Sequence, residues 1–273
     1  MRSERKEGDK KASIYAASRV SQSPILILFR EVDMNKLMTP EEYIDAWNLN
    51  AKQHFDDGDY EWICDRIRQI PSKINKIFEI GCGSGYSTLT MVLRDFDVVS
   101  IDANGSAIEA TQKLIAEHDY IPVEDFAKFI QADIVHDYEK IKDELASNPC
   151  DVILLCNPGG SPKTNLTMQE EKWLRWGNFT DDEFTIDNLH QLHTYAMIFA
   201  SCGLALESGI PLLIVQRDKH DDILNTLQQI ANDTGVRLIN NCLRQIKPAP
   251  VGGITLSGDN TDLYWGLGLY FSE

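Results

Sequence analysis

From residue 76 onward, short apolar runs alternate with longer segments whose apolar residues recur at helical spacing. The runs predict strands, and five of them are KIFEI, DVVSI, KFIQA, DVILLC and PLLIVQ, beginning at residues 76, 97, 128, 151 and 211. Helices are predicted after Gly85, from Ser106, near 137–146, up to Leu206 and over 220–234, followed by two last strands, VRLINNCLRQI and DLYWGLGLYF. Apolar strands joined by helices predict an α/β fold, doubly wound, in which helices cover both faces of a mostly parallel sheet.

Two amphipathic helices are predicted ahead of this sheet. Thr39 followed by Pro40 and by Glu42 is a capping-box pattern, which predicts a helix over 40–54. A second helix is predicted over 59–70 and ends before Pro71. We therefore expect three regions: a tail over 1–33, a helical cap over 34–75 that packs on the main domain, and the main domain over 76–273.

Composition narrows the class of protein. A formal charge of −16 works against a broad phosphate-binding surface, so a nucleic-acid partner is less favoured, although KWLRW at 172–176 is a local basic cluster. No apolar run approaches the roughly 18–20 residues of a membrane helix, and no secretory leader pattern opens the chain. Six scattered cysteines without a C-x-x-C pair predict reduced thiols and no metal site. Together with the lack of a membrane span and of a secretory leader pattern, this predicts a cytoplasmic protein without a membrane partner.

The stretch IFEIGCGSGYST combines the end of a strand with three glycines, Gly81, Gly83 and Gly85. Glycines at a strand-to-helix turn let a ligand lie against the backbone, as in nucleotide-binding turns. Dinucleotide-binding turns read G-x-G-x-x-G, but Tyr86 stands at the position of the last glycine. Glu79 two residues before the turn would repel a pyrophosphate, and it suits a ligand with a cationic amine.

Two acids follow the next two strands. Asp102 ends the strand VVSID, where a carboxylate can accept hydrogen bonds from both hydroxyls of a ribose. Asp133 follows FIQA, where it can meet the exocyclic amine of an adenine. Each acid alone could instead be a helix N-terminal charge or a solvated turn residue. Together with the glycine turn they predict a ligand with an amine, a ribose and an adenine, which is S-adenosylmethionine.

The motifs FEIGCGSG, SIDAN, QADI and DVILLCNPGG, in this order, resemble those of the class I (Rossmann-like) S-adenosylmethionine-dependent methyltransferases. The resemblance covers about residues 76–273 and implies a seven-stranded sheet whose last strand is antiparallel. It also implies S-adenosyl-L-methionine as cofactor and a methyl acceptor as partner. The residues implied to bind the cofactor are Glu79, Gly81, Cys82, Gly83, Gly85, Asp102, Ala103, Asp133, Ile134 and Cys156.

The catalytic residues are less clearly marked. Methyl transfer is an in-line displacement that depends mainly on alignment, so a general base is optional. Asn157-Pro158 resembles the first half of the N/D-P-P-Y/F motif of methyltransferases that act on planar amino nitrogens, but Gly159 and Gly160 replace its second half. Asn157 is therefore a candidate positioning residue or a plain turn residue. We expect the insertion over 159–181, together with the helices over 40–70, to roof the substrate pocket.

Three functions remain open from the sequence. The first is methyl transfer to a small-molecule or protein acceptor, favoured by the four motifs and the acidic charge. The second keeps the cofactor and makes RNA or DNA bases the acceptor, because of Asn157-Pro158. The third is a non-catalytic module that binds S-adenosylmethionine. A nicotinamide dehydrogenase is disfavoured by Glu79 and Tyr86.

Overall fold

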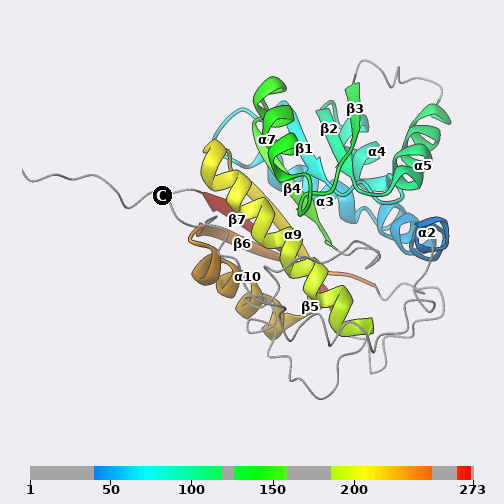
Figure 1. Ribbon diagram of the computed structural model, residues 1–273. Helices are drawn as coiled ribbons and strands as arrows, with labels where there is room; N and C mark the ends of the chain where they lie inside the picture. Colours follow the sequence, from blue (N-terminus) through cyan, green and yellow to red (C-terminus); the bar gives the residue numbers. More distant parts are fainter. Residues whose placement is uncertain (1–39, 119–125, 159–185, 248–262, 272–273) are drawn as a thin grey trace, which may run out of the picture.

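A seven-stranded sheet forms the centre of the molecule (Figure 1). The computed structural model describes residues 40–118, 126–158, 186–247 and 263–271. Across the sheet the strands follow the order β3-β2-β1-β4-β5-β7-β6. Their bounds are β1 Lys76–Ile80, β2 Asp97–Asp102, β3 Ala127–Gln131, β4 Val152–Cys156, β5 Leu212–Lys219, β6 Arg237–Gln245 and β7 Leu263–Phe271.

The first five strands are parallel, and the last strand is antiparallel to its neighbours. β1 pairs with β2 on one side and with β4 on the other, so the strand order reverses at β1. β7 is inserted between β5 and β6 and runs antiparallel to both. The prediction of a seven-stranded, mostly parallel sheet with an antiparallel last strand is therefore confirmed.

Helices cover both faces of the sheet, as the continuous apolar strands predict. One core cluster joins β-strand residues such as Phe78 to α7 (Tyr138–Ser147), α9 (Ile186–Ser208) and α10 (His220–Thr234). The other joins residues such as Ile77 to α3 (Asp59–Arg68) and α4 (Tyr86–Leu93). Neighbouring residues of β1 thus face opposite clusters, which confirms the doubly wound arrangement.

Two further helices lie beside α4. They are α5 (Gly105–Ala116), which follows β2, and α2 (Pro40–Asp56), which packs against α3, α4 and α5. α5 begins one residue before the predicted Ser106, because the side chain of Asn104 accepts a hydrogen bond from the Ser106 amide and caps the helix. The division into tail, cap and main domain stays a prediction, and Thr39 lies outside the described residues.

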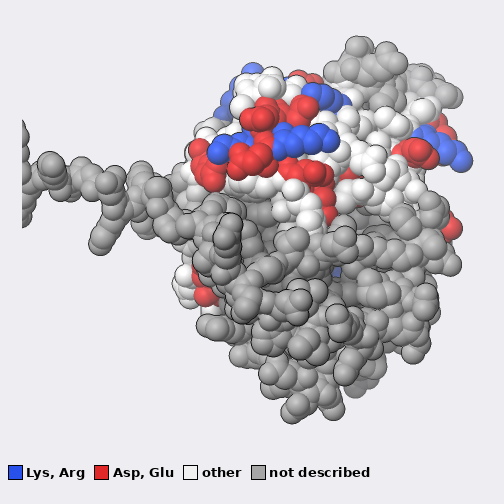
Figure 2. All heavy atoms as spheres, viewed as in Figure 1, with Lys and Arg blue, Asp and Glu red and all other residues white. Residues whose placement is uncertain are grey.

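Charged side chains of both signs are intermixed on the face seen in Figure 2, where the described atoms are coloured. Lys128 pairs with Glu144, and Lys142 pairs with Glu207. Within the described part of this face no broad basic surface appears. None of the helices in the described ranges is both long and apolar enough to cross a membrane.

Candidate functional site

A pocket of about 300 Å³ opens where the parallel strands end. Its walls come from the turns that follow β1, β2, β3 and β4, and from α2, α3, α9 and the first turn of α4. This is the switch point of the sheet, where open α/β folds bind ligands. Nine of the predicted site residues line the pocket: Gly81, Cys82, Gly83, Asp102, Ala103, Asp133, Ile134, Cys156 and Asn157.

The three glycines of the turn are required for different reasons. All three have left-handed φ angles, of 83° at Gly81, 53° at Gly83 and 88° at Gly85, which favour glycine. A Cβ at Gly83 would meet nothing within 4 Å, so its backbone borders the open pocket. A Cβ at Gly85 would lie 2.8 Å from the Cα of Thr111 in α5. Gly85 therefore allows two helices to pack closely, and it does not line the pocket.

Glu79 lies beneath the turn and does not line the pocket. Its side chain is fully buried, and its carboxylate accepts hydrogen bonds from the hydroxyls of Ser87 at 2.5 Å, Thr88 at 2.5 Å and Ser100 at 2.8 Å. Burial raises the pKa of this carboxyl group, and the three hydroxyls oppose the rise. Direct contact of this carboxylate with a ligand amine stays a prediction. Glu79 joins β1 to β2 and to the first turn of α4.

Asp102 lies at the pocket wall, at the end of β2. One carboxylate oxygen accepts a hydrogen bond from the Gly83 amide at 3.0 Å, and the other accepts from the Asn104 amide at 2.8 Å. Asp102 also lines the pocket, where its carboxylate can accept hydrogen bonds from a ligand. Burial raises the pKa of Asp102, and hydrogen bonds from the amides of Asn104 and Gly83 and from Cys82 oppose that rise. The carboxylate is thus held in place by the glycine turn that it faces.

Asp133 is nearly buried in the turn after β3. One oxygen accepts from the Val135 amide at 2.8 Å, and the other lies 2.9 Å from Nδ1 of His136. The turn is held further by the Asp133 amide, which donates to Asp137 at 3.0 Å. These contacts fix the backbone of Ile134 at the pocket wall.

The end of β4 supplies Cys156, Asn157 and Pro158 to the pocket. Asn157 has a left-handed φ of 46°, a conformation that asparagine tolerates better than most residues, and its amide donates to the Val215 carbonyl at 2.8 Å. The Pro158 carbonyl accepts from the hydroxyl of Thr194 at 3.2 Å. Burial raises the pKa of the Cys156 thiol, so this group is neutral at physiological pH. Gly159, Gly160 and the rest of the insertion lie outside the described residues.

The N-terminal helices contribute a second wall of the pocket. The sequence predicted that these helices lie over the pocket but did not indicate which of their residues line it. Residues of α2 and α3 line the pocket, namely Ile44, Trp47, Asn50, Ala51, His54 and Tyr60. In α2 most of them are spaced by three or four residues, which places them on one helix face. Trp47 and Tyr60 belong to this wall, and a helical stripe of aromatic residues in the sequence does not distinguish a core face from a pocket face. His193 and Met197 of α9 complete this wall.

Charge within the pocket has one sign. Asp102 and Asp133 are the only acidic lining residues among the described ones, and no lysine or arginine lines the pocket in that part of the chain. A pyrophosphate would therefore meet carboxylates without a balancing cation. A cationic or neutral ligand suits the described walls better.

The strand order, the antiparallel β7 and the glycine turn at the switch point together decide the architecture. They match the seven-stranded sheet with an antiparallel last strand that the resemblance to the class I methyltransferases implies. No protein-family model matches the chain, and no curated protein matches it significantly in sequence.

Solved structures with a similar fold include three methyltransferases. The N-methyltransferase NodS from Bradyrhizobium japonicum WM9, with S-adenosyl-L-homocysteine, is 12% identical over 85% of this chain and 96% of its own, with a TM-score of 0.48. A putative RNA methyltransferase from Pyrococcus horikoshii is 10% identical over 79% and 81%, with a TM-score of 0.47. Magnesium protoporphyrin IX methyltransferase from Synechocystis PCC 6803, with bound SAM, is 12% identical over 92% of each chain, with a TM-score of 0.43.

Proposed function

We propose that this protein is an S-adenosylmethionine-dependent methyltransferase that acts on a small-molecule or protein acceptor by in-line displacement. The observation that carries the proposal is the pocket at the switch point. It combines an open glycine backbone with two carboxylates, and none of its described lining residues is a lysine or an arginine. That chemistry suits a ligand with a sulfonium, an amine, a ribose and an adenine, and it does not suit a pyrophosphate.

The turns after β1, β2 and β3 would contact successive parts of this cofactor. Asp102, which lines the pocket and is held by the amides of Gly83 and Asn104, would accept hydrogen bonds from the ribose hydroxyls. The backbone of Gly81 to Gly83 would support the methionine portion, and Asp133 with Ile134 would border the adenine. When bound, the cofactor supplies an activated methyl group on a sulfonium.

The turn after β4 lies between the cofactor wall and the helical wall. β4 is the neighbour of β1 on the side away from β2, so Cys156, Asn157 and Pro158 would border the reacting centre. Asn157 would position the acceptor through its side-chain amide. The hydrogen bond from the Asn157 amide to the Val215 carbonyl holds this left-handed backbone conformation, so the position from which the side chain extends is fixed.

Isothermal titration with S-adenosylmethionine and with NAD tests the cofactor. We expect binding of the former and weaker or no binding of the latter. Asp102→Ala should weaken S-adenosylmethionine binding by about 30- to 150-fold, or about 2–3 kcal/mol, because one or two hydrogen bonds to a charged group are lost. Asp97→Ala is the matched control, since Asp97 is an exposed acid at the opposite end of the same strand. Tighter binding of NAD would overturn the proposal.

Methyl transfer from labelled cofactor to a panel of metabolites, proteins and tRNA tests the acceptor. We expect label in the small-molecule or protein fraction, lost in Asp102→Ala. Label in nucleic acid would instead favour the base methyltransferase suggested by Asn157-Pro158. Cofactor binding without transfer to any fraction would favour a non-catalytic module.

A further inference from the structure

His54 of α2 is a buried histidine whose second ring nitrogen has no partner among the described residues. The residue is 2% exposed, and it is one of the residues that line the pocket. Nδ1 lies 2.8 Å from a carboxylate oxygen of Asp59, whereas Nε2 is buried without a hydrogen-bond partner in the described part of the chain. A buried polar atom of this kind carries a cost unless something binds it. The pocket is where a ligand could supply the missing partner.

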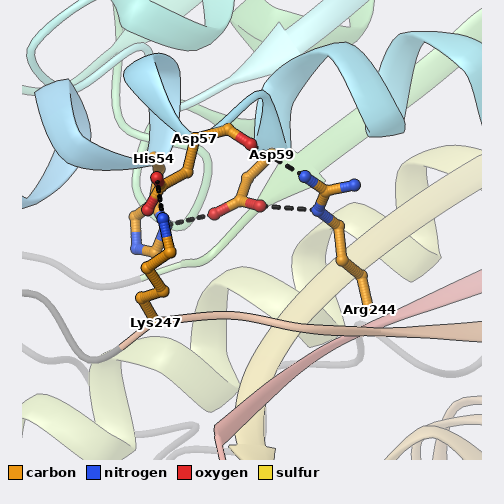
Figure 3. Close-up of polar contacts among 5 residues, drawn as sticks. All are labelled: His54, Asp57, Asp59, Arg244 and Lys247. Atoms are coloured by element: carbon orange, nitrogen blue, oxygen red, sulfur yellow. Dashed lines mark hydrogen bonds and ion pairs between the residues drawn. The ribbon is translucent and has the colours of Figure 1, made fainter.

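The partners of Asp59 fix which nitrogen carries the proton (Figure 3). The other Asp59 oxygen accepts from Nε of Arg244 at 2.6 Å, and Arg244 also donates to the Asp57 carbonyl at 2.9 Å. A carboxylate paired with a guanidinium is an acceptor, so Nδ1 of His54 must be the donor in their hydrogen bond. In the neutral imidazole the lone pair then lies on Nε2, and this is the arrangement of a general base held by a carboxylate.

His54 lies on the side of the pocket away from the two acids. Its ring centroid is 4.5 Å from that of Trp265 in β7, which pairs with Arg217 of β5. Asp102 and Asp133 follow β2 and β3, and β1 and β4 lie between those strands and β5. If the cofactor lies along Asp102 and Asp133, as the proposed function requires, then His54 borders the space left for the acceptor.

A second unpartnered group stands one helical turn before His54. Nδ2 of Asn50 is buried and has no hydrogen-bond partner among the described residues, and Asn50 also lines the pocket. Residues four apart lie on the same helix face. An acceptor here would therefore meet one donor from Asn50 and one lone pair from His54.

We propose that His54 is the general base of the methyl transfer and that the acceptor is an uncharged molecule with a hydroxyl group. The inference rests on the proposed function. As the bond from the acceptor oxygen to the methyl carbon forms, the bond from that carbon to the donor sulfur breaks and the sulfur keeps the electron pair. The hydroxyl proton moves to Nε2 of His54, and Asp59 stabilises the resulting imidazolium. Asp59 is a positioning residue, since it acts through His54.

The described walls near His54 favour an uncharged acceptor. They include the aromatic side chains of Trp47 and Tyr60, together with the amide of Asn50. A charged acceptor would enter without a counter-ion from the described lining, at a high desolvation cost. An aromatic ring with one hydroxyl suits both the walls and the two polar groups.

Nitrogen-15 NMR of histidine-labelled protein tests the tautomer without any ligand. The His54 signals are assigned by their loss in His54→Phe, or in His54→Leu where the first variant does not fold. We expect a protonated Nδ1 and an unprotonated Nε2. Asp59→Asn should change the proportion of the two tautomers, whereas His118→Gln, at an exposed histidine, should leave the His54 signals unchanged. A protonated Nε2 in the wild-type protein would overturn the proposal.

Binding of phenol and of anisole to protein saturated with S-adenosylhomocysteine tests the acceptor chemistry. Phenol should bind at least about tenfold more tightly than anisole, because anisole cannot donate a hydrogen bond to His54. In His54→Phe the two dissociation constants should become similar. Equal affinities in the wild type, or no phenol binding at millimolar concentration, would overturn the proposal. Failure to bind S-adenosylhomocysteine would instead contradict the proposed function, while the tautomer measurement would still stand.

Discussion

The two ends of the pocket are built in different ways. The sheet end consists of Gly81–Gly83, Asp102 and Asp133, which lie at or just beyond the ends of β1, β2 and β3. Their hydrogen bonds join residues between 2 and 19 positions apart. The cap end consists of the pocket residues of α2 and α3. Asp59 and Asp57 hold it to Arg244 and Lys247, 185 and 190 residues further along the chain.

The two ends of the pocket therefore serve different purposes. At the sheet end the strands bring backbone amides and acids to one edge, so the same geometry suits any ligand with a ribose and an amine. At the cap end the orientation of a polar group such as His54 depends on contacts between side chains from distant segments of the chain. We therefore expect sheet-end changes to affect overall folding or cofactor binding, and cap-end changes to affect local stability and the acceptor.

Gly85→Ala should have the largest effect. The new Cβ would lie 2.8 Å from the Cα of Thr111, and the φ of 88° is strained for any other residue. Overpacking and backbone strain together should lower the free energy of unfolding by about 3–4 kcal/mol, measured by urea denaturation. Gly209→Ala is the control, since its φ of 69° is similar and its Cβ would meet nothing within 4 Å. It should cost about 1–2 kcal/mol. Equal losses would mean that helix packing is not the reason for Gly85.

Glu79→Ala should have the next largest effect. The change leaves the buried hydroxyls of Ser87, Thr88 and Ser100 without their acceptor, and it opens a cavity. We expect a loss of about 2–3 kcal/mol in the free energy of unfolding. Glu109→Ala, at an exposed glutamate of α5, should have little effect. A stable Glu79→Ala protein that no longer binds S-adenosylmethionine would instead indicate direct contact between Glu79 and the ligand.

Arg244→Met should affect the cap end. Loss of the guanidinium leaves the buried carboxylate of Asp59 with His54 as its remaining side-chain partner among the described residues. Because the Arg244 side chain is itself 31% exposed, we expect a cost of only about 1–2 kcal/mol. Hydrogen exchange should accelerate in α2 more than in the sheet. Lys52→Met removes the exposed pair with Asp56 in the same helix and should leave exchange unchanged. Uniform acceleration in the Arg244 variant would contradict a local tether.

Glu79→Gln should have the smallest effect, visible only in the pH dependence of stability. Burial raises the pKa of Glu79 above its ordinary value of 4.5, so the folded state holds this proton to higher pH than the unfolded chain. The stability from the protonated group is fully present below the unfolded pKa and is lost as pH rises through the folded pKa. Thermal denaturation across that window should therefore show a flatter pH dependence in the variant. An unchanged slope would mean that the hydrogen bonds from the three hydroxyls fully offset the effect of burial on the pKa of Glu79.

Much of the sheet end could be predicted because its signals are local. The glycine turn, the apolar strands and the acids at strand ends are each contained in a few consecutive residues, and parallel strands bring their carboxyl ends to one edge. Even here one distinction depended on burial. Glu79 near the end of β1 and Asp102 at the end of β2 are both strand acids, but one faces three hydroxyls inside the protein and the other lines the pocket. A sequence pattern does not contain that distinction.

The sequence by itself determined the element types, the glycine turn and the two strand-end acids, because these follow from side-chain periodicity and from backbone conformations that only some residues adopt. Only the tertiary structure decided which face of α2 borders the pocket, and that Asp59 lies between His54 and Arg244. Residues 185 positions apart come together through the packing of the cap against β6 and β7, and no local pattern records such a contact.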